Sequence, residues 1–215
     1  MKWPLQLPPL YPIVNVTGED ETAVESARRL AIELAEAGAG ILQLRAKTLG
    51  AGAFVELTTT VVAALEGSTC RIIVNDRADV ALLSGAAGVH VGDEDLPVEA
   101  VRRVIGSDAI LGYSTHSVAE LAAANDLDAD YLAFGPVFES PTKAGVRQAR
   151  GLALLEQACR AATRPVVAIG GITIERARQC WQAGAASVAV ISEIERSGDR
   201  RTLLARYRES WGRTR

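Results

Sequence analysis

Two aspartates that follow neighbouring apolar runs are the residues of this sequence best suited to metal chemistry. Asn75-Asp76 follows the apolar run 71–74, and Asp95 follows the next short run, Gly88–Val91. Each run has the length and composition of a buried strand, so both carboxylates are predicted to lie just past strand ends. Mg²⁺ typically takes one or two carboxylates from a protein and completes its shell with substrate phosphates and waters. Asp76 and Asp95 are therefore predicted to bind a divalent cation, with helix capping as the alternative for Asp95.

Polar side chains also follow other predicted strands. Gln43, Arg45 and Lys47 alternate along the second strand and its end, so they point to one side, where an amide and two cations suit an anionic ligand. An exposed basic edge is the alternative. The segment 114–117 places hydroxyls just before a helix, which favours either an anion or an ordinary helix cap. His116 could transfer a proton, support a neighbour by hydrogen bonding or lie at the surface.

Three further features point to phosphate groups. The loop after the sixth predicted strand is the longest, and long loops in compact domains tend to be functional. It is predicted to act as a lid that carries a phosphate-binding Lys143. Gly170-Gly171 follows the seventh strand and Ser192 follows the eighth, which matches the phosphate-binding corner common in barrels, although glycine pairs also serve tight turns. The sequence thus predicts two anionic ligands, one of them a metal-chelating diphosphate.

The elements that must position these residues alternate regularly along the chain. Short, continuously apolar runs are typical of parallel strands covered on both faces, and amphipathic segments lie between them. The predicted strands are Tyr11–Val16, Ile41–Arg45, Ile72–Asn75, Gly88–Val91, Ala109–Tyr113, Tyr131–Phe134, Val166–Ile169 and Ser187–Ile191. The predicted helices are Glu21–Ala37, Ala51–Leu65, Arg77–Ser84, Pro97–Ile105, Ser117–Asn125, Leu152–Ala162, Ile174–Trp181 and Leu203–Trp211.

Eight strand–helix units indicate an α/β protein with a single (β/α)8 TIM barrel, whose ligand site lies at the C-terminal ends of the strands. A doubly wound open sheet is the alternative, but it usually has fewer strands. We expect one domain over residues 1–215, in which the proline-rich segment 1–9 forms a short arm outside the barrel. Glycines at the junctions after predicted helices, Gly38, Gly85 and Gly184, are typical of left-handed helix ends.

Composition narrows the classes of function. The chain has 215 residues, 23 basic and 26 acidic, for a net charge of −3, so no general basic field favours nucleic acid. The three cysteines are widely spaced, without a CxxC pair, which argues against a zinc or redox site and indicates a reducing compartment. The start lacks an apolar signal region, and no apolar run is long enough to span a bilayer. We expect a cytoplasmic protein with small-molecule substrates and no nucleic-acid or membrane partner.

Taken together, the motifs resemble those of the thiamine phosphate synthase family, and the resemblance covers nearly the whole chain, from Tyr11 to Ser192. In chain order the motifs are Gln43-Leu44-Arg45-Ala46-Lys47, Asn75-Asp76-Arg77-Ala78-Asp79-Val80-Ala81, Gly88-Val89-His90-Val91-Gly92, Ser114-Thr115-His116, Gly135-Pro136-Val137-Phe138 with Thr142-Lys143, and Ala168-Ile169-Gly170-Gly171-Ile172.

The resemblance implies an Mg²⁺-dependent transferase of thiamine biosynthesis. It would condense 4-amino-2-methyl-5-(diphosphooxymethyl)pyrimidine with 4-methyl-5-(2-phosphooxyethyl)thiazole, or the 2-carboxylate of that thiazole, and release diphosphate. The pyrimidine diphosphate would be bound by Gln43, Arg45, Lys47, Asn75, Ser114 and Lys143, and Tyr11 would contact the pyrimidine. Leu44, Ala46 and His116 would be further substrate-binding residues. The thiazole phosphate would be bound by Ser140, Pro141, Thr142, Gly171, Ile191 and Ser192. Asp76 and Asp95 would hold the metal.

The family's reaction is a dissociative substitution, which requires charge stabilisation and positioning more than a protein nucleophile. Lys143, Ser114 and Arg45 are implied to act in catalysis by stabilising the departing diphosphate. Closure of the loop after the sixth strand would protect the transient pyrimidine cation from water. Asn15, where the family usually has a Thr-Asp-like ending, and Asp93, where it usually has glutamine, depart from the pattern and affect fine detail of the pocket.

Two other functions fit parts of the pattern. A thiazole tautomerase shares the histidine after the fifth strand and the phosphate corner, but it needs no diphosphate or metal, so Asp76, Asp95 and Lys143 argue against it. A non-catalytic paralogue that only binds thiazole or thiamine phosphate would be expected to have lost a metal ligand or Lys143. Nucleophilic hydrolysis has little support, since no Ser–His–Asp arrangement is evident.

Overall fold

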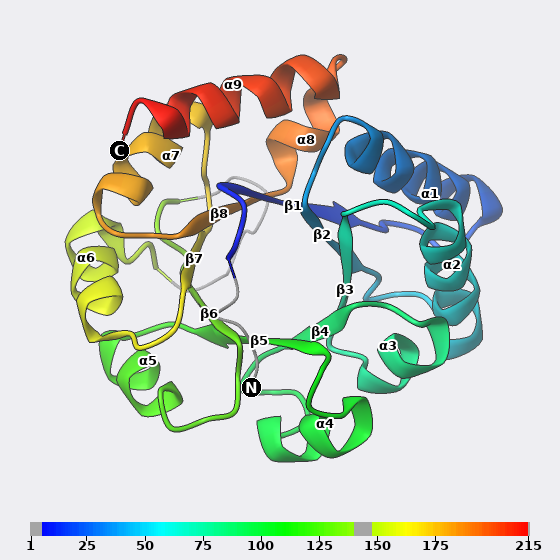
Figure 1. Cartoon of the computed structure of the whole chain (residues 1–215), viewed down its shortest axis with the longest axis horizontal. Coiled ribbons are helices and arrows are strands. Elements are labelled where there is room, and N and C mark those ends of the chain that lie inside the picture. Colours follow the sequence, from blue (N-terminus) through cyan, green and yellow to red (C-terminus); the bar gives the residue numbers. More distant parts are fainter. Residues whose placement is uncertain (1–5, 140–147, 215) are drawn as a thin grey trace.

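Eight parallel strands close into a barrel, and helices surround it (Figure 1), in the computed structural model, which describes residues 6–139 and 148–214. Each strand pairs with the next along the chain, and β8 (Ser187–Val190) pairs with β1 (Leu10–Asn15) to complete the ring. The remaining strands are β2 (Ile41–Arg45), β3 (Arg71–Asn75), β4 (Gly88–Val91), β5 (Ile110–Thr115), β6 (Tyr131–Phe134) and β7 (Val166–Ile169). The predicted (β/α)8 barrel is confirmed.

Each predicted helix is present to within a few residues at its ends. The helices are α1 (Glu21–Glu36), α2 (Ala51–Ala64), α3 (Ala78–Ser84), α4 (Val98–Ile105), α5 (Val118–Ala124), α6 (Gly151–Ala161), α7 (Ile174–Gln182), α8 (Ser192–Arg196) and α9 (Arg200–Gly212). Polar residues fix several starts: Asp20, Ser117, Thr173 and Asp199 each accept a hydrogen bond from a backbone N–H of the first turn. Gly38, Gly85 and Gly184 have φ of 92°, 71° and 102°, as their predicted role requires.

Two elements differ from the prediction. Strand β5 continues to Thr115, two residues further than expected, so Ser114 and Thr115 belong to the strand and not to the loop before α5. The short helix α8 was missed, because five residues are too few to show helical periodicity. Both differences lie at strand ends, where a residue or two decides which side chains face the pocket.

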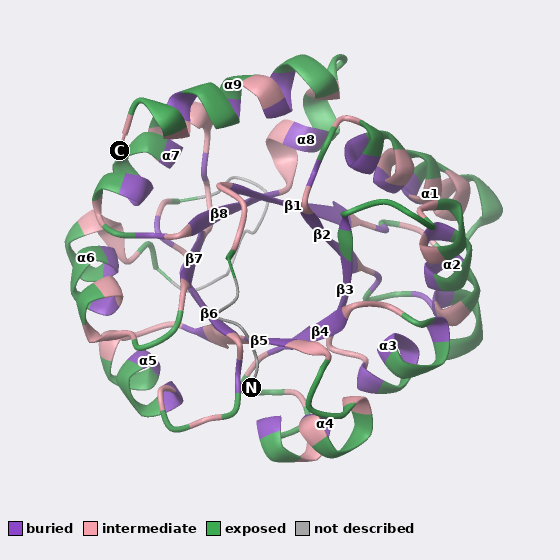
Figure 2. Ribbon diagram, in the orientation of Figure 1, coloured by how far each residue is buried: buried purple, intermediate pink, exposed green. Residues whose placement is uncertain are grey.

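The buried residues form two layers, one on each side of the strands. Figure 2 shows the ring of strands in the colour of buried residues, and helices that are buried on their inward side and exposed outside. The larger layer lies between strands and helices. The smaller layer fills the barrel interior and contains Tyr11, Ile13, Ile41, Ile73, Tyr131, Ala133, Val167 and Ala189. The two buried tyrosines among these aliphatic residues bring polar atoms into the middle of the barrel.

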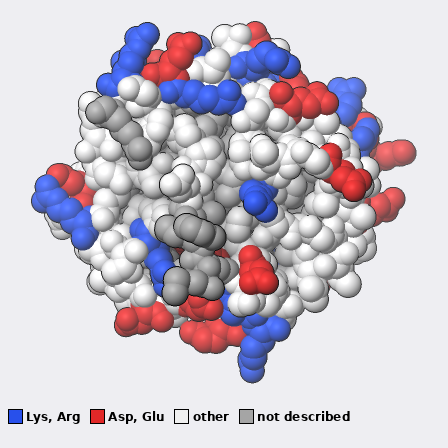
Figure 3. Space-filling view, in the orientation of Figure 1, with Lys and Arg blue, Asp and Glu red and all other residues white. Residues whose placement is uncertain are grey.

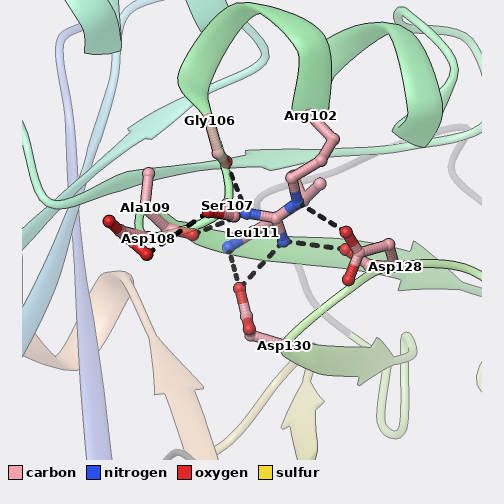
Figure 4. Close-up of polar contacts among 8 residues, drawn as sticks. All are labelled: Arg102, Gly106, Ser107, Asp108, Ala109, Leu111, Asp128 and Asp130. Atoms are coloured by element: carbon pink, nitrogen blue, oxygen red, sulfur yellow. Dashed lines mark hydrogen bonds and ion pairs between the residues drawn. The ribbon is translucent and has the colours of Figure 1, made fainter. Parts of the chain in front are cut away.

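Arg102 on α4 ties β5 to β6 at the N-terminal end of the strands (Figure 4). Its guanidinium donates to the carbonyl oxygens of Ala109 at 2.7 Å and Asp128 at 2.8 Å, and it pairs with the Asp130 carboxylate at 3.1 Å. The same carboxylate oxygen of Asp130 accepts the backbone N–H of Leu111 at 2.7 Å. This cluster anchors β5 at its start and so contributes to the placement of the polar residues at its other end.

The described part of the N-terminal segment packs against the barrel. It runs across the barrel opening in Figure 1, and Leu7 contacts the interior layer. Trp181 donates from Nε1 to the carbonyl of Pro9 at 3.3 Å, and Val188 donates to the same oxygen at 3.0 Å. On the face seen in Figure 3, Lys, Arg, Asp and Glu side chains lie mostly around the rim, over the helices.

Across residues 6–139 and 148–214, we find no helix with both the length and the apolar character needed to cross a membrane.

Candidate active site

The C-terminal ends of β2, β3, β4 and β5 bring the predicted ligand residues together. Gln43 and Arg45 lie on β2, Asn75 ends β3, and Ser114 lies near the end of β5. Parallel pairing places Asn75 beside His90 of β4. Gln43 and Asn75 are almost fully buried, whereas Arg45 and Ser114 are partly exposed. These side chains thus come from neighbouring strands and lead from the barrel interior to the strand-end surface.

Asp76 occupies an unusual backbone conformation at the end of β3. Its φ is +63°, and it is the only residue other than glycine with positive φ in the described ranges. Arg77 donates its N–H to the carbonyl of Asn75 at 2.8 Å, so Asp76 is the central residue of a tight γ-turn. Its own N–H donates to the carbonyl of His90 at 2.8 Å. Such strained residues gather at functional sites, where surrounding structure holds them in place.

The carboxylates of Asp76 and Asp95 lie in contact, as the metal prediction requires. Burial raises the pKa of Asp95, and the negative charge and side chain of Asp76 raise it further, while the N–H of Gly92 and the charge of Lys47 oppose the increase. Gly92 donates this N–H to Asp95 at 2.8 Å. Two adjacent carboxylates favour a cation, and Lys47 pairs with Asp76. The donor set therefore fits Mg²⁺ bound by two carboxylates and completed by substrate oxygens.

No cluster of three or more His, Cys, Asp or Glu side chains suited to a metal occurs in the described part of the chain. Two carboxylates fill only part of the octahedral shell of Mg²⁺, so a metal here would share its coordination with a ligand. Arg77, by contrast, donates from Nε to the Asp79 carboxylate at 2.8 Å, a pairing that gives it a structural role.

Asn15, one of the two departures from the family pattern, supports Arg45. The two residues are direct partners in the pairing of β1 with β2, and Arg45 donates from Nη1 to the amide oxygen of Asn15 at 2.7 Å. This bond restricts a long, partly exposed cation at the edge of the pocket. Asn15 is thus a site residue that sequence reasoning did not include.

Replacing Asn15 by alanine is expected to raise KM for the pyrimidine diphosphate that the resemblance implies about three- to tenfold, and to leave KM for the implied thiazole phosphate unchanged. This change corresponds to about 0.7–1.4 kcal/mol, less than the full value of a hydrogen bond to a charged group, because Arg45 is partly exposed. Steady-state kinetics with each substrate varied in turn checks this. Replacement of Asn15 by aspartate keeps an acceptor and should restore KM to near its original value, whereas equal changes in both KM values would contradict the assignment.

A continuous chain of hydrogen bonds crosses the barrel interior below this pocket. Gln43 donates from Nε2 to the Tyr11 hydroxyl at 3.5 Å, and the hydroxyls of Tyr11 and Tyr131 lie 2.8 Å apart. The Tyr131 hydroxyl lies 2.9 Å from Nδ1 of His90, and Nε2 of His90 lies 2.8 Å from Oγ of Ser114. We call these five residues, Gln43, Tyr11, Tyr131, His90 and Ser114, the interior hydrogen-bond chain.

His90 is neutral in this position. Burial lowers its pKa to about 4, although the negative charge of Asp76 acts in the opposite direction. Burial also raises the pKa of Tyr11 and Tyr131, so both hydroxyls keep their protons. Tyr11 is only 1% exposed, and its predicted contact with the pyrimidine stays a prediction. His90 and Tyr131 were not among the predicted site residues; the histidine inside the apolar run Gly88–Val91 was the available signal.

The hydroxyls after the fifth predicted strand have separate roles. Ser117 caps α5 and accepts from the N–H of Glu120 at 3.1 Å, and Thr115 donates to the carbonyl of Ala133 at 2.8 Å. Ser114 alone joins the interior hydrogen-bond chain. His116 donates from Nδ1 to the carbonyl of Gly135 at 2.7 Å, which connects β5 to the loop after β6.

Close backbone contacts join the loop after β6 to the loop after β7. Val137 and Phe138 donate to the carbonyls of Ile169 and Gly170 at 2.8 and 3.1 Å. Gly171 has φ of +61°, and a Cβ there would lie 2.4 Å from the carbonyl oxygen of Glu139. The predicted phosphate ligands Ile191 and Ser192 lie where β8 passes into α8. Ser140, Pro141, Thr142 and Lys143 fall outside the described residues.

The fold is a (β/α)8 barrel, and its strand ends bring cations together with a carboxylate pair, an arrangement suited to an enzyme with anionic ligands. The family model for thiamine monophosphate synthase matches residues 10–194, and the chain belongs to this family.

Relatives and a solved structure agree with this membership. A thiamine-phosphate synthase of Anaeromyxobacter dehalogenans is 42% identical over 174 residues, which cover 81% of this chain and 78% of that protein. A thiamine biosynthesis bifunctional protein ThiM/ThiE of Symbiobacterium thermophilum is 43% identical over 74% of this chain, which spans only 33% of that longer protein. The structure of a thiamine phosphate pyrophosphorylase from Pyrococcus furiosus superposes with a TM-score of 0.82, at 30% identity over 96% of both chains.

Proposed function

We propose that this barrel joins the pyrimidine diphosphate to the thiazole phosphate, or to its 2-carboxylate form with loss of CO₂, and releases diphosphate, the reaction that defines the family to which it belongs. The observation that carries the proposal is the contact of Asp76 with Asp95 beside Lys47, at the ends of strands that also present Arg45, Asn75 and Ser114. A carboxylate pair next to cations suits a diphosphate that arrives with a divalent metal.

Asp76 and Asp95 would hold the Mg²⁺. When bound, the metal supplies positive charge that stabilises the departing diphosphate. The γ-turn fixes the Asp76 backbone, and the N–H of Gly92 fixes Asp95, so both carboxylates are oriented before the ligand arrives. Such preorganisation avoids the cost of reorienting polar groups during the reaction.

The protein's own cations and donors complete the stabilisation of the leaving group. Arg45, oriented by Asn15, and Lys47 provide positive charge on the β2 side, and the Ser114 hydroxyl adds a polar group near the end of β5. As the bond between the pyrimidine methylene carbon and the diphosphate oxygen breaks, the electron pair leaves with the oxygen. The electron-rich aminopyrimidine stabilises the methylene cation, and the thiazole nitrogen then donates its lone pair to that carbon. This mechanism requires the protein to stabilise charge and to position the substrates, and it needs no protein nucleophile.

The thiazole phosphate would bind on the opposite side of the pocket. Gly171, Ile191 and Ser192 supply backbone and hydroxyl groups at the β7–β8 corner, which is the usual phosphate position in this fold. The junction of the loops after β6 and β7 shapes this corner, because Gly170 and Gly171 allow the backbone to approach the segment 136–139.

The proposal is tested by incubating the purified protein with both substrates and Mg²⁺ and measuring thiamine phosphate. We expect product that depends on both substrates and is abolished by a chelator. A protein that isomerised the thiazole carboxylate but made no thiamine phosphate would instead be a tautomerase. Binding of thiazole phosphate without either reaction would indicate the non-catalytic paralogue.

A further inference from the structure

We propose that the interior hydrogen-bond chain fixes the Ser114 hydroxyl as a hydrogen-bond donor toward the ligand, which makes His90 and Tyr131 positioning residues. The inference rests on the proposed function for the identity of that ligand, a diphosphate, but the geometry of the chain stands without it. Five side chains from β1, β2, β4, β5 and β6 take part, so the chain connects most of the barrel to one hydroxyl at the strand ends.

Gln43 sets the direction of the hydrogen bonds in the interior hydrogen-bond chain. Its amide nitrogen can only donate, so the Tyr11 oxygen accepts there and the Tyr11 hydrogen is left for the hydroxyl of Tyr131. The Tyr131 oxygen accepts this bond, and its own hydrogen then points to Nδ1 of His90. Each hydroxyl is thus used once as acceptor and once as donor.

The histidine transmits this direction to the serine. A neutral imidazole carries one N–H, and because Nδ1 accepts from Tyr131, the proton must lie on Nε2. Nε2–H then donates to Oγ of Ser114 at 2.8 Å. Since the serine oxygen is used as the acceptor, its hydrogen is directed elsewhere, and Ser114 is partly exposed at the end of β5.

The opposite direction is disfavoured in this arrangement. If Ser114 donated to His90, the bonds would run toward Tyr11, whose hydrogen would then meet the N–H of Gln43 instead of an acceptor. Tyr11 is 1% exposed, so a hydroxyl hydrogen without an acceptor there would lose its hydration without compensation. The buried bond between Gln43 and Tyr11 thus determines whether the Ser114 hydroxyl donates or accepts at the other end of the interior hydrogen-bond chain.

The direction has a chemical consequence at the pocket. Oxygens of a diphosphate accept hydrogen bonds and donate none, so a hydroxyl that must donate inward to His90 would face them with its lone pairs. With the Nε2–H tautomer of His90, the hydroxyl of Ser114 is instead held as a donor. It would strengthen its bond as charge accumulates on the leaving diphosphate.

Gly112 provides the space that the chain needs. The rings of His90 and Tyr131 stack with centroids 5.5 Å apart and planes inclined by 24°, directly against Gly112 of β5. A Cβ at this position would lie 2.2 Å from Cζ of Tyr131 and 2.4 Å from Nδ1 of His90. The hydrogen bond between the Tyr131 hydroxyl and Nδ1 of His90 therefore depends on the absence of a side chain at residue 112.

The first test reads the tautomers directly by ¹⁵N NMR of histidine-labelled protein without substrates. The chain has only two histidines, and the structure assigns them opposite forms: Nε2–H for His90, and Nδ1–H donated to the Gly135 carbonyl for His116. In Tyr131→Phe, the His90 signals should shift as Nδ1 loses its donor, while those of His116 stay unchanged. An Nδ1–H tautomer at His90 in the unmodified protein would overturn the proposal, whatever reaction the protein catalyses.

The second test is a double-mutant cycle in the thiamine phosphate assay. Tyr131→Phe is expected to lower kcat/KM for the pyrimidine diphosphate about tenfold, the effect of one hydrogen bond, and to leave KM for the thiazole phosphate unchanged. In a Ser114→Ala background the same change should have an effect of less than about twofold, because the hydroxyl through which Tyr131 is proposed to act is absent. Tenfold losses in both backgrounds would mean that Tyr131 acts independently of Ser114.

Tyr113→Phe is the matched control for this cycle. It removes the same hydroxyl group one residue before Ser114, but Tyr113 packs against the outer core layer on the other face of β5. Its kcat/KM should stay within about twofold of the unmodified protein. A loss equal to that of Tyr131→Phe would show that the assay reports general disturbance of β5 and would contradict the proposal.

Discussion

Replacing Asp76 by alanine is expected to lower turnover about a thousandfold or more. The change removes one of two adjacent carboxylates at the site proposed for Mg²⁺, and that ion would supply several kcal/mol of charge stabilisation. Thiamine phosphate formation at saturating substrates measures the loss. Mg²⁺ with diphosphate is expected to raise the melting temperature of the unmodified protein, and this increase should be absent in Asp76→Ala.

Two further variants separate the charge of Asp76 from its backbone. Asp76→Gly also lacks the carboxylate but tolerates φ of +63° better, so it should be equally inactive and at least as stable as the alanine variant. Asp79→Ala removes an exposed carboxylate that pairs with Arg77 and should keep near-normal activity. Full activity in Asp76→Gly would exclude Asp76 as a metal ligand.

Sequence patterns predicted the fold and many of the polar residues at the strand ends, because both leave their signal in short runs of consecutive residues. Parallel strands covered on both faces leave continuous apolar runs, and the residue that follows each run must lie at one end of the barrel. Asp76 and Asp95 could therefore be placed together from two runs read separately. Their contact in the structure agrees with that placement.

The interior hydrogen-bond chain could not be predicted in the same way. Tyr11 and Tyr131 are 120 residues apart in sequence, and they meet only because the barrel closes and both strands turn these residues inward. The bond between Asn15 and Arg45 likewise depends on the register of β1 against β2. Positive φ at Asp76 carries no signal either, because aspartate is an ordinary residue at many backbone positions.

The barrel interior joins stability to function at Gly112. Gly112 lies on β5 between β4 and β6, and its lack of a side chain allows the His90 and Tyr131 rings to stack beneath Ser114. The same contacts therefore hold the strands together and position the site. A side chain at this position must displace rings that the surrounding strands hold in place. Loss of stability and loss of activity should therefore occur together in variants of this residue.

Gly112→Ala is accordingly expected to destabilise the protein by about 3 kcal/mol or more, at the upper end of the cost of overpacking a buried site. The added Cβ would lie 2.2 Å from Cζ of Tyr131, and neither strand can move without disturbing its neighbours. The midpoint of urea denaturation, with the slope compared to confirm two-state unfolding, measures the change. Any folded fraction should show altered ¹⁵N signals for His90.

Gly52→Ala makes the same chemical change in helix α2 and should have the opposite effect. Among the described residues, no heavy atom lies within 4 Å of a Cβ built there, and alanine is favoured over glycine by up to about 1 kcal/mol in a helix. This variant should thus unfold at higher urea concentration than the unmodified protein and retain full activity. If Gly112→Ala were as stable and as active as Gly52→Ala, the close packing of Tyr131 and His90 against Gly112, on which the interior hydrogen-bond chain depends, would be wrong.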